Sequence, residues 1–354
     1  MRKPPCRLDE VLERLGAVLS GMKLDGEVFI PSERILCDLV GTSRMTIRKA
    51  LDELESQGKI ETGARGRVLA AKRVAIKPKG KVLFISSGHE WITLHAWNRL
   101  WARLNSILKP DGYDMNIKLY SESSAFSAAE LKGYDFIILT DIQSHLRNAF
   151  ADHLTGREGV ISSYEGFADI AKHVVALDND AAGRMGAELL LGSGYKRPAL
   201  FHCGQNYVGF QKRRAGFLDV CRSAKFDAPP REFQLASLSL SAYARDLIAA
   251  SDALIKTDCD SVFVTSDEVI GLAYDTFARC YAIPAEFGLA TFAGVHEGLM
   301  HHPTITTVGH GTAQVAQAMH KLMEDIRLGK ARAEGVRILV KPNVHAGATL
   351  RNEN

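Results

Sequence analysis

Residues 30–69 concentrate side chains that can bind phosphate groups and base edges. A helix that begins at Ser43 would place Arg44 and Arg48 four residues apart on one face, with Lys49 beside them. The opposite face of that helix would be apolar, and the Ser43 hydroxyl would cap its first turn. Guanidinium groups donate hydrogen bonds to phosphates and base edges, while the apolar face would hold the helix on its domain. This pattern favours a helix that enters a groove of DNA.

Two further helices and a short basic ribbon are expected around this helix. Apolar residues at helical spacing predict a first helix that ends near Ser20, and a second that begins after Ser32 and ends at Gly41. After the third helix, two short strands would be joined by a glycine-bounded turn that carries Arg65, with Arg67 just beyond it. Three helices and a hairpin make a winged helix-turn-helix. We expect this α+β domain at residues 1–71, its strands at 59–62 and 67–70, and a basic linker at 72–80.

The length and the charge distribution limit the classes of protein that fit. A chain of 354 residues is too long for one ordinary core, so two or three domains are expected. Residues 1–79 hold 16 Lys and Arg against 11 Asp and Glu, while the remainder holds 28 against 30. A basic head on a slightly acidic body suggests that the head alone meets a polyanion, although ordinary surface variation would also explain so small an excess.

Membrane insertion, export and cysteine chemistry are all disfavoured by the sequence. No run approaches the roughly 18 apolar residues of a membrane span, and residues 1–13 lack the apolar core of a secretion signal. We therefore expect a cytoplasmic protein. The six cysteines are scattered without a CxxC pair, which favours buried thiols over metal or disulfide use. Neither a cofactor nor a metal ion is expected.

From Lys81 onward the sequence alternates between apolar runs typical of buried strands and stretches at helical spacing. The strand-like runs are Val82–Ile85, Phe136–Leu139, Val160–Ile161, Ala199–Phe201, Val262–Val264 and Leu289–Phe292. Such alternation predicts α/β lobes with parallel sheets and helices on both faces. The length suits two lobes, with a ligand in the crevice beyond the carboxyl ends of the strands.

The basic head carries a family resemblance. The residues concerned are Pro31-Ser32-Glu33-Arg34, Ser43-Arg44-x-Thr46-Ile47-Arg48-x-Ala50-Leu51-x-x-Leu54, Gly58, Gly63 and Gly66. In type, order and spacing they resemble the DNA-binding domain of the GntR (gluconate-repressor) family. The resemblance implies that Arg34, Arg44, Thr46 and Arg48 contact DNA and that the wing near Arg65 reaches the minor groove. We add Ser43, Lys49 and Arg67 to these expected contacts.

A second resemblance covers most of the remaining chain. Its motifs are Leu177-Asp178-Asn179-Asp180-x-x-Gly183, Gly194-Tyr195-Lys196-Arg197, Arg213-x-x-Gly216-Phe217, Val262-Phe263-Val264-Thr265-Ser266-Asp267-x-x-x-Gly271 and Pro303-x-Ile305-Thr306-Thr307-Val308. In this order they resemble the effector domain of the lactose/galactose-repressor family, which has the fold of periplasmic sugar-binding proteins. A GntR-type head on such a body is the arrangement of the arabinose-repressor subgroup. We expect an effector-binding and dimerisation domain at 81–354, with one lobe at about 81–177 and 309–335 and the other at about 178–308 and 336–354.

The second resemblance also implies ligand contacts. It implies that Arg213 donates hydrogen bonds to ligand hydroxyls and that Asp267 accepts them. Without the resemblance, an ion pair on a helix surface would also explain Arg213. Ser266 stands where the family tends to have Asn, and His310 stands near a position often held by Gln. These four residues are the expected effector contacts of the second half of the chain.

Weaker candidates come from the first lobe. A loop after the strand at 82–85 contains His89 and Trp91, and this Trp could stack on a sugar face or could equally be a core or dimer residue. Asp141, Ser163 and Tyr164 follow strand-like runs and would face the crevice. We include all five among the expected effector contacts.

No motif in the sequence demands an enzyme, and no catalytic residue is expected. The segment from His296 to His302 superficially resembles the zinc-protease motif HExxH, but its second histidine, His301, follows five residues after the first. A helix would turn that residue about 140° away from the first. No Gly-x-Ser-x-Gly elbow and no phosphate-binding P-loop occur.

The sequence therefore predicts a ligand-responsive transcription regulator that acts as a repressor. We expect a homodimer in which each winged helix occupies one half-site of a two-fold symmetric operator, and a sugar-like effector between the lobes. The alternative is a small-molecule-binding protein or an enzyme whose head mediates protein contact. Within the regulator class, an activator or a repressor whose ligand strengthens DNA binding stays open.

Overall fold

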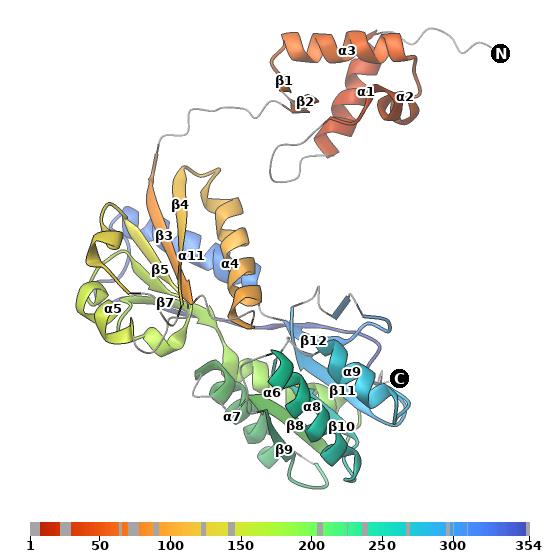
Figure 1. Cartoon of the computed structure of the whole chain (residues 1–354), viewed down its shortest axis with the longest axis vertical. Helices are drawn as coiled ribbons and strands as arrows, with labels where there is room; N and C mark the ends of the chain where they lie inside the picture. Colours follow the sequence, from red (N-terminus) through yellow and green to blue (C-terminus); the bar gives the residue numbers. More distant parts are fainter. Residues whose placement is uncertain are drawn as a thin grey trace, which may run out of the picture. The chain divides into compact units, whose positions relative to one another are not determined.

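The computed structural model divides the chain into two compact units, residues 1–77 and 78–354 (Figure 1). The described residues are 8–21, 30–63, 66–69, 78–87, 92–121, 125–140, 146–203, 208–224, 226–235, 240–266, 270–294, 298–299, 301–309 and 311–351. Among them, no helix is both long and apolar enough to cross a membrane.

The first unit has the predicted three helices and a two-stranded wing. These elements are α1 (Leu8–Gly21), α2 (Glu33–Val40), α3 (Arg44–Ser56), β1 (Ile60–Gly63) and β2 (Gly66–Leu69). Helix α2 ends at Gly41, whose φ of +74° suits glycine. The Ser43 hydroxyl accepts a hydrogen bond from the Thr46 backbone N–H at 3.3 Å and so caps α3, as predicted. Strands β1 and β2 pair antiparallel, each within about one residue of its predicted bounds.

An apolar core holds the three helices together. Its members from α3 are the predicted buried face, Ile47, Ala50, Leu51 and Leu54, all at most 4% exposed. They pack against buried side chains of α1 and α2, such as Leu15. Because this face is buried, the arginine face of α3 turns to solvent.

The first lobe of the second unit is a six-stranded parallel sheet in the order β13-β7-β6-β5-β3-β4. Its strands are β3 (Gly80–Ser87), β4 (Tyr113–Tyr120), β5 (Phe136–Leu139), β6 (Val160–Ser162), β7 (His173–Leu177) and β13 (Arg337–Val340). Helices α4 (Ile92–Leu108) and α11 (Thr312–Arg327) pack on the face that carries Val82 and Phe84. The 3₁₀ turns η1 (Ala128–Leu131) and η3 (Glu165–Phe167) and helix α5 (Arg147–Leu154) cover the other face. Helices on both faces agree with the sequence prediction.

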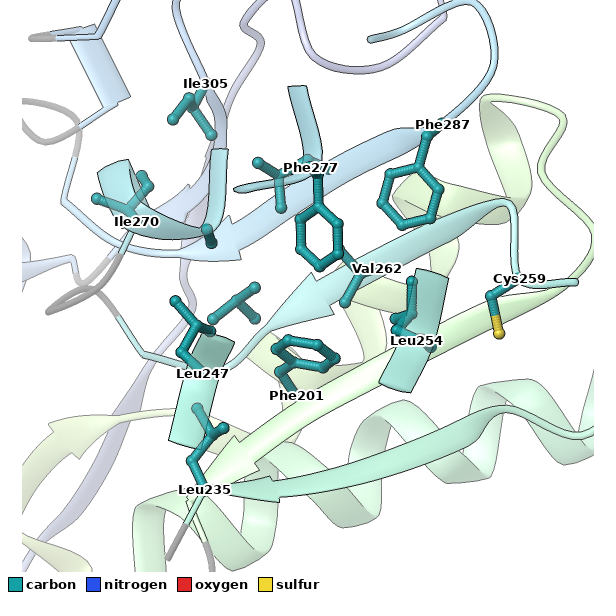
Figure 2. Packing of buried hydrophobic residues seen from close by; sticks show 14 of the residues in the cluster. Phe201, Leu235, Leu247, Leu254, Cys259, Val262, Ile270, Phe277, Phe287 and Ile305 are labelled. Carbon is teal, nitrogen blue, oxygen red and sulfur yellow. The ribbon is translucent and has the colours of Figure 1, made fainter. Parts of the chain in front are cut away.

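The second lobe repeats this plan with the strand order β14-β12-β11-β10-β8-β9, in which only β14 runs antiparallel. Its strands are β8 (Pro198–Cys203), β9 (Arg231–Leu235), β10 (Ser261–Val264), β11 (Gly288–Phe292), β12 (Thr306–Gly309) and β14 (Asn343–His345). Helices α6 (Asn179–Gly192) and α7 (Val208–Ser223) pack on one face. Helices α8 (Leu240–Ile255) and α9 (Ile270–Ala278) cover the other, where Phe201, Val262 and Phe277 point toward one another (Figure 2).

The chain passes between the lobes three times, and the third passage lies later than predicted. Because β13 pairs with β7, the first lobe continues to Val340 instead of ending at residue 335. Gly335, with a φ of +97°, turns the chain within the first lobe, and the passage falls at residues 341–342. Residue 309 belongs to the second lobe, because it ends β12. The third passage, predicted at about residues 335–336, was therefore placed five residues too early, whereas the bound predicted at about residue 309 agrees within one residue.

The three passages lie against one another. The Asp178 backbone N–H donates to the Val340 carbonyl at 2.8 Å. A Cβ placed on Gly311 would lie 3.4 Å from Val340 and 3.5 Å from Leu177. Three short segments in mutual contact thus connect the two lobes. Of the predicted linker, residues 72–77 lie outside the described residues, and Gly80 already belongs to β3.

Candidate DNA-binding surface and interlobe site

On the head, one carboxylate of α2 binds both arginines that the sequence singled out on α3. Arg44 Nε donates to Glu33 Oε2 at 2.7 Å. Arg48 donates through Nε to Oε1 at 2.9 Å and through Nη2 to Oε2 at 3.0 Å. These hydrogen bonds, Arg48 first, lower the pKa of Glu33 to about 2, so this carboxylate is ionised at neutral pH. The side chains of Arg44 and Arg48 are 71% and 52% exposed, so both remain accessible to a duplex.

The other predicted DNA contacts of the head lie on the same helices or on the wing. Arg34 and Lys49 are exposed on α2 and α3. The Thr46 hydroxyl lies 2.8 Å from the Ser43 hydroxyl at the start of α3. Arg65 lies outside the described residues. Their contact with DNA stays a prediction.

Arg67 has a structural contact that the sequence analysis missed. Its guanidinium forms ion pairs with Asp52 and, at 3.3 Å, with Glu55 of α3. The Thr62 hydroxyl also donates to Glu55, at 2.7 Å. Both strands of the wing are thus fastened to α3, and only a quarter of the Arg67 side chain is exposed. Its contact with DNA stays a prediction, whereas its role in holding the wing is visible.

In the second lobe, Arg213 is buried and held by backbone carbonyls and aromatic rings. It is 5% exposed, which excludes the surface ion pair considered from the sequence. Its Nε donates to the Gly209 carbonyl at 3.2 Å, and its Nη1 donates to the Thr265 carbonyl at 2.5 Å. The guanidinium carbon lies 3.8 Å from the centre of the Phe292 ring. The guanidinium is thus held by two carbonyls and by an aromatic ring that attracts its charge. It is therefore a rigid hydrogen-bond donor at the carboxyl end of β10.

Two glycines bring the helix that carries Arg213 against its neighbour. A Cβ on Gly183 of α6 would lie 1.9 Å from the Arg213 carbonyl oxygen, and one on Gly216 of α7 would lie 2.2 Å from the Asp180 carbonyl oxygen. No side chain fits at either place, so the backbones of α6 and α7 touch. Both glycines belong to the motifs that carry the second family resemblance. The close packing of α6 on α7 explains why these motifs contain glycine.

Two of the other predicted effector contacts are buried at strand ends. Ser266 follows β10 and accepts a hydrogen bond at its carbonyl from the Thr291 hydroxyl, at 3.3 Å. Ser163 follows β6, and its hydroxyl donates to the Leu139 carbonyl at 3.3 Å. Five further candidates lie outside the described residues, namely His89, Trp91, Asp141, Asp267 and His310.

Tyr164, the last predicted contact, joins the lobes directly. Its hydroxyl accepts a hydrogen bond from the Val208 backbone N–H at the start of α7, at 2.9 Å. The next residue, Glu165, forms an ion pair with Lys212 one turn further along α7. We call these two contacts the interlobe contact. It links the carboxyl side of β6 to α7, the helix that also carries Arg213.

Reversing the charge of Lys212 should break the interlobe contact. In Lys212→Glu two carboxylates would lie side by side, and their repulsion should separate η3 from α7. We expect hydrogen exchange of the Val208 amide in the full chain to accelerate about tenfold or more. The double variant Glu165→Lys with Lys212→Glu restores opposite charges and should restore protection. Unchanged exchange in Lys212→Glu would contradict the assignment.

A polar cluster on the first lobe was also missed by the sequence analysis. Ligand atoms of Asp111, His320 and Glu324 lie within 4.8 Å of one another, close enough to hold a metal ion. However, the Lys79 ammonium already contacts Asp111 at 2.7 Å and Glu324 at 3.2 Å. Although burial raises the pKa of Asp111, hydrogen bonds from Lys79 and His320 lower it on balance. These contacts therefore connect Lys79, near the start of the second unit, to helix α11.

Comparisons with known proteins agree with both parts of this description. Residues 9–69 match the family model described as bacterial regulatory proteins, gntR family. Residues 187–350 match the periplasmic binding protein-like domain. No curated protein matches the chain significantly.

Solved structures share the fold at low sequence identity. A LacI transcriptional regulator from a Rhodococcus species is 16% identical, with a TM-score of 0.62 over 77% of this chain and 98% of that one. A periplasmic binding protein/LacI transcriptional regulator from Alkaliphilus metalliredigens, complexed with D-xylulofuranose, is 15% identical, with a TM-score of 0.60 over 77% and 99%. The complex of the transcriptional regulator CelR with cellobiose is also 15% identical, with a TM-score of 0.61 over 98% and 100%.

The fold and the two sites define a transcription regulator with a DNA-binding head and a two-lobed second domain. The head is a DNA-binding domain of the GntR family, and the second domain is a periplasmic-binding-protein-like effector domain. The first predicted resemblance is confirmed, and so is the periplasmic-binding-protein-like fold that the second one implies. The arabinose-repressor subgroup stays a prediction.

Proposed function

We propose that this regulator is a repressor whose operator affinity changes when a sugar-like ligand binds between the lobes. The observation that carries the proposal is Arg213, a buried guanidinium fixed against Phe292 at the carboxyl end of β10. Ligands of parallel α/β lobes bind beyond this end of the strands. Structures of the same fold are complexed with D-xylulofuranose and with cellobiose, which supports a sugar-like ligand. The protein is not an enzyme in this proposal.

The proposed mechanism needs two arrangements of the lobes. A ligand that binds one arrangement better shifts the population toward it, by no more than its difference in affinity between the two. The interlobe contact at Tyr164 and Glu165 is the contact that such a rearrangement would remake. In a cytoplasmic homodimer, a change in lobe arrangement would change the spacing of the two heads. Operator affinity would then change because each head occupies one half of a two-fold symmetric site.

The proposal is tested first by ligand screening of the full chain. Pentoses, hexoses, sugar acids, sugar phosphates and nucleosides are added singly in a thermal-shift assay. A ligand that binds only the folded protein should raise its stability by about 2.7 kcal/mol at a hundredfold excess over Kd. The same ligand should then change the affinity for a duplex selected from a random library. No stabilisation by any compound would count against a sugar-like effector.

Salt dependence separates this function from its alternative. Groove binding through several Arg and Lys side chains should weaken steeply as salt rises. A head that only contacts protein should select no duplex at any salt concentration, and that outcome would overturn the proposed repressor.

A further inference from the structure

The turns that precede the strands of the first lobe carry an excess of basic side chains. Because the sheet is parallel, these turns all lie at the same end of the lobe. They are residues 78–79, 109–112, 132–135, 155–159, 168–172 and 328–336, and together they hold seven Lys and Arg against five Asp and Glu. Residues 80–354 as a whole are slightly acidic, with 28 basic against 30 acidic residues, so this excess is local.

Most of the acidic side chains in these turns are engaged, whereas most of the basic ones are not. Four of the five carboxylates accept a hydrogen bond or form an ion pair, namely Asp111 with Lys79, Asp135 with the Lys81 backbone N–H, Glu158 with Lys172 and Asp169 with Arg147. Five basic side chains form no ion pair with any residue that the structure describes: Lys109, Lys132, Arg157, Lys330 and Arg332. We call these five side chains the basic end. All of them except Arg157 are exposed.

The basic end lies where the chain enters the second unit. The Lys79 backbone N–H donates to the Gly112 carbonyl at 2.9 Å, in the turn that carries Lys109. The Lys79 ammonium contacts Glu324 of α11 at 3.2 Å, six residues before Lys330. Lys79 is therefore bound both to the turn of Lys109 and to the helix from which the turn of Lys330 continues.

The length of the preceding segment keeps the basic end close to any DNA that the head binds. Eight residues, 70–77, separate β2 of the head from Pro78, and eight residues span at most about 28 Å. A duplex carries one phosphate about every 3.4 Å along each strand, so this span covers about eight phosphates. Tethering makes a second contact intramolecular and gives it a high effective concentration. Residues 70–77 also include Lys72, Arg73 and Lys77 and no acidic residue.

We propose that the basic end binds backbone phosphates of the same duplex that the head occupies. DNA is the partner that fits, because exposed Lys and Arg side chains neutralise phosphates and the head brings a duplex within reach. Such contacts carry no sequence information, so they raise the affinity for every duplex by a similar factor. The head then selects the sequence, and the effector domain adds affinity. The inference rests on DNA binding by the head and is independent of the effector.

The test begins with a duplex selected from a random library by the full chain. Affinity is measured over a range of salt concentrations for that duplex and for an unrelated duplex of equal length. The double variant Lys330→Gln with Arg332→Gln should bind both duplexes about tenfold less tightly, and its salt slope should be smaller by about 1.8, since each phosphate contact contributes about 0.9. The matched control, Lys256→Gln with Arg279→Gln, removes two exposed charges of the second lobe that form no ion pair with a described residue. Its affinity should stay within about twofold, because distant exposed charges are screened.

Chemical acetylation of lysines in the full chain locates the contact. Bound duplex should slow the acetylation of Lys330 and leave that of Lys256 unchanged. Both double variants should unfold at the temperature of the unmodified chain, which distinguishes loss of contact from loss of fold. The proposal is overturned if the two double variants bind DNA alike, if the salt slope does not fall, or if the duplex leaves Lys330 unprotected. Failure of the full chain to select any duplex would instead overturn DNA binding by the head.

Discussion

Replacing Gly183 with alanine should destabilise the effector domain and disturb Arg213 together. The added methyl group would lie 1.9 Å from the Arg213 carbonyl oxygen and 2.9 Å from the Phe217 backbone nitrogen, which no side-chain rotation relieves. Helix α7 would have to move away from α6. Overpacking of this kind costs about 1–3 kcal/mol and sometimes more. Because Arg213 is anchored to α7 through Gly209, its guanidinium should lose its place against Phe292.

The same helix supplies a matched control. Gly192 ends α6, and no atom lies within 4 Å of a Cβ placed there. Alanine in a helix is favoured over glycine by about 0.5–1 kcal/mol, so Gly192→Ala should be neutral or slightly stabilising. Chemical denaturation of the full chain measures both variants. Equal stability of Gly183→Ala and Gly192→Ala would show that α6 and α7 do not touch as described.

The head was predicted well because its signals are local. A serine cap, a glycine stop and an apolar stripe fix α2 and α3, and the structure places all of them as expected. The contacts of Glu33 with Arg44 and Arg48 were not predicted. They join residues 11 and 15 positions apart on two helices, so only the angle between those helices reveals them.

The sheets were predicted where both faces of a strand are buried. β5 is a continuous apolar run, β10 and β11 are largely apolar, and every residue of the three strands is buried. Strands at the edges of the sheets contain no such run of buried residues. In β4 the side chains of Ile117 and Leu119 are exposed, and polar residues alternate with them, so the segment resembles neither a buried strand nor a loop. The sequence also did not place β13, because its pairing with β7 joins residues 163 positions apart, such as Val174 and Arg337.

The interlobe site shows the same division between local and long-range information. Arg213 was found through its motif, but its burial depends on Phe292, which lies on a strand 79 positions further along, and on the Thr265 carbonyl, 52 positions away. Tyr164 was expected to face a ligand. The structure shows that its hydroxyl meets α7, a contact that no pattern in the sequence indicates.

Truncation of the Arg213 side chain should lower the affinity for the ligand more than truncation of any other single side chain in the effector domain. Arg213→Ala removes the donor to two backbone carbonyls and the cation on Phe292. Hydrogen bonds that involve a charged group contribute about 1.5–3 kcal/mol, so affinity for the ligand identified by screening should fall about tenfold to a hundredfold or more. Isothermal titration of the full chain measures this loss, and DNA binding without ligand should be unchanged.

The neighbouring arginine distinguishes a ligand contact from a general effect of charge. Arg214 lies on the same helix but is exposed and forms an ion pair with Glu232. Arg214→Ala removes an equal charge and a similar volume, yet it should leave ligand affinity within about twofold, because exposed ion pairs contribute little. Arg213→Ala removes the side-chain donor of the buried Thr265 carbonyl and should also lower stability by about 1–3 kcal/mol. Arg213→Lys keeps a donor and much of the volume, so a folded Arg213→Lys variant that still fails to bind would assign the loss to the guanidinium. Normal ligand affinity in both Arg213 variants would place the effector elsewhere on the domain.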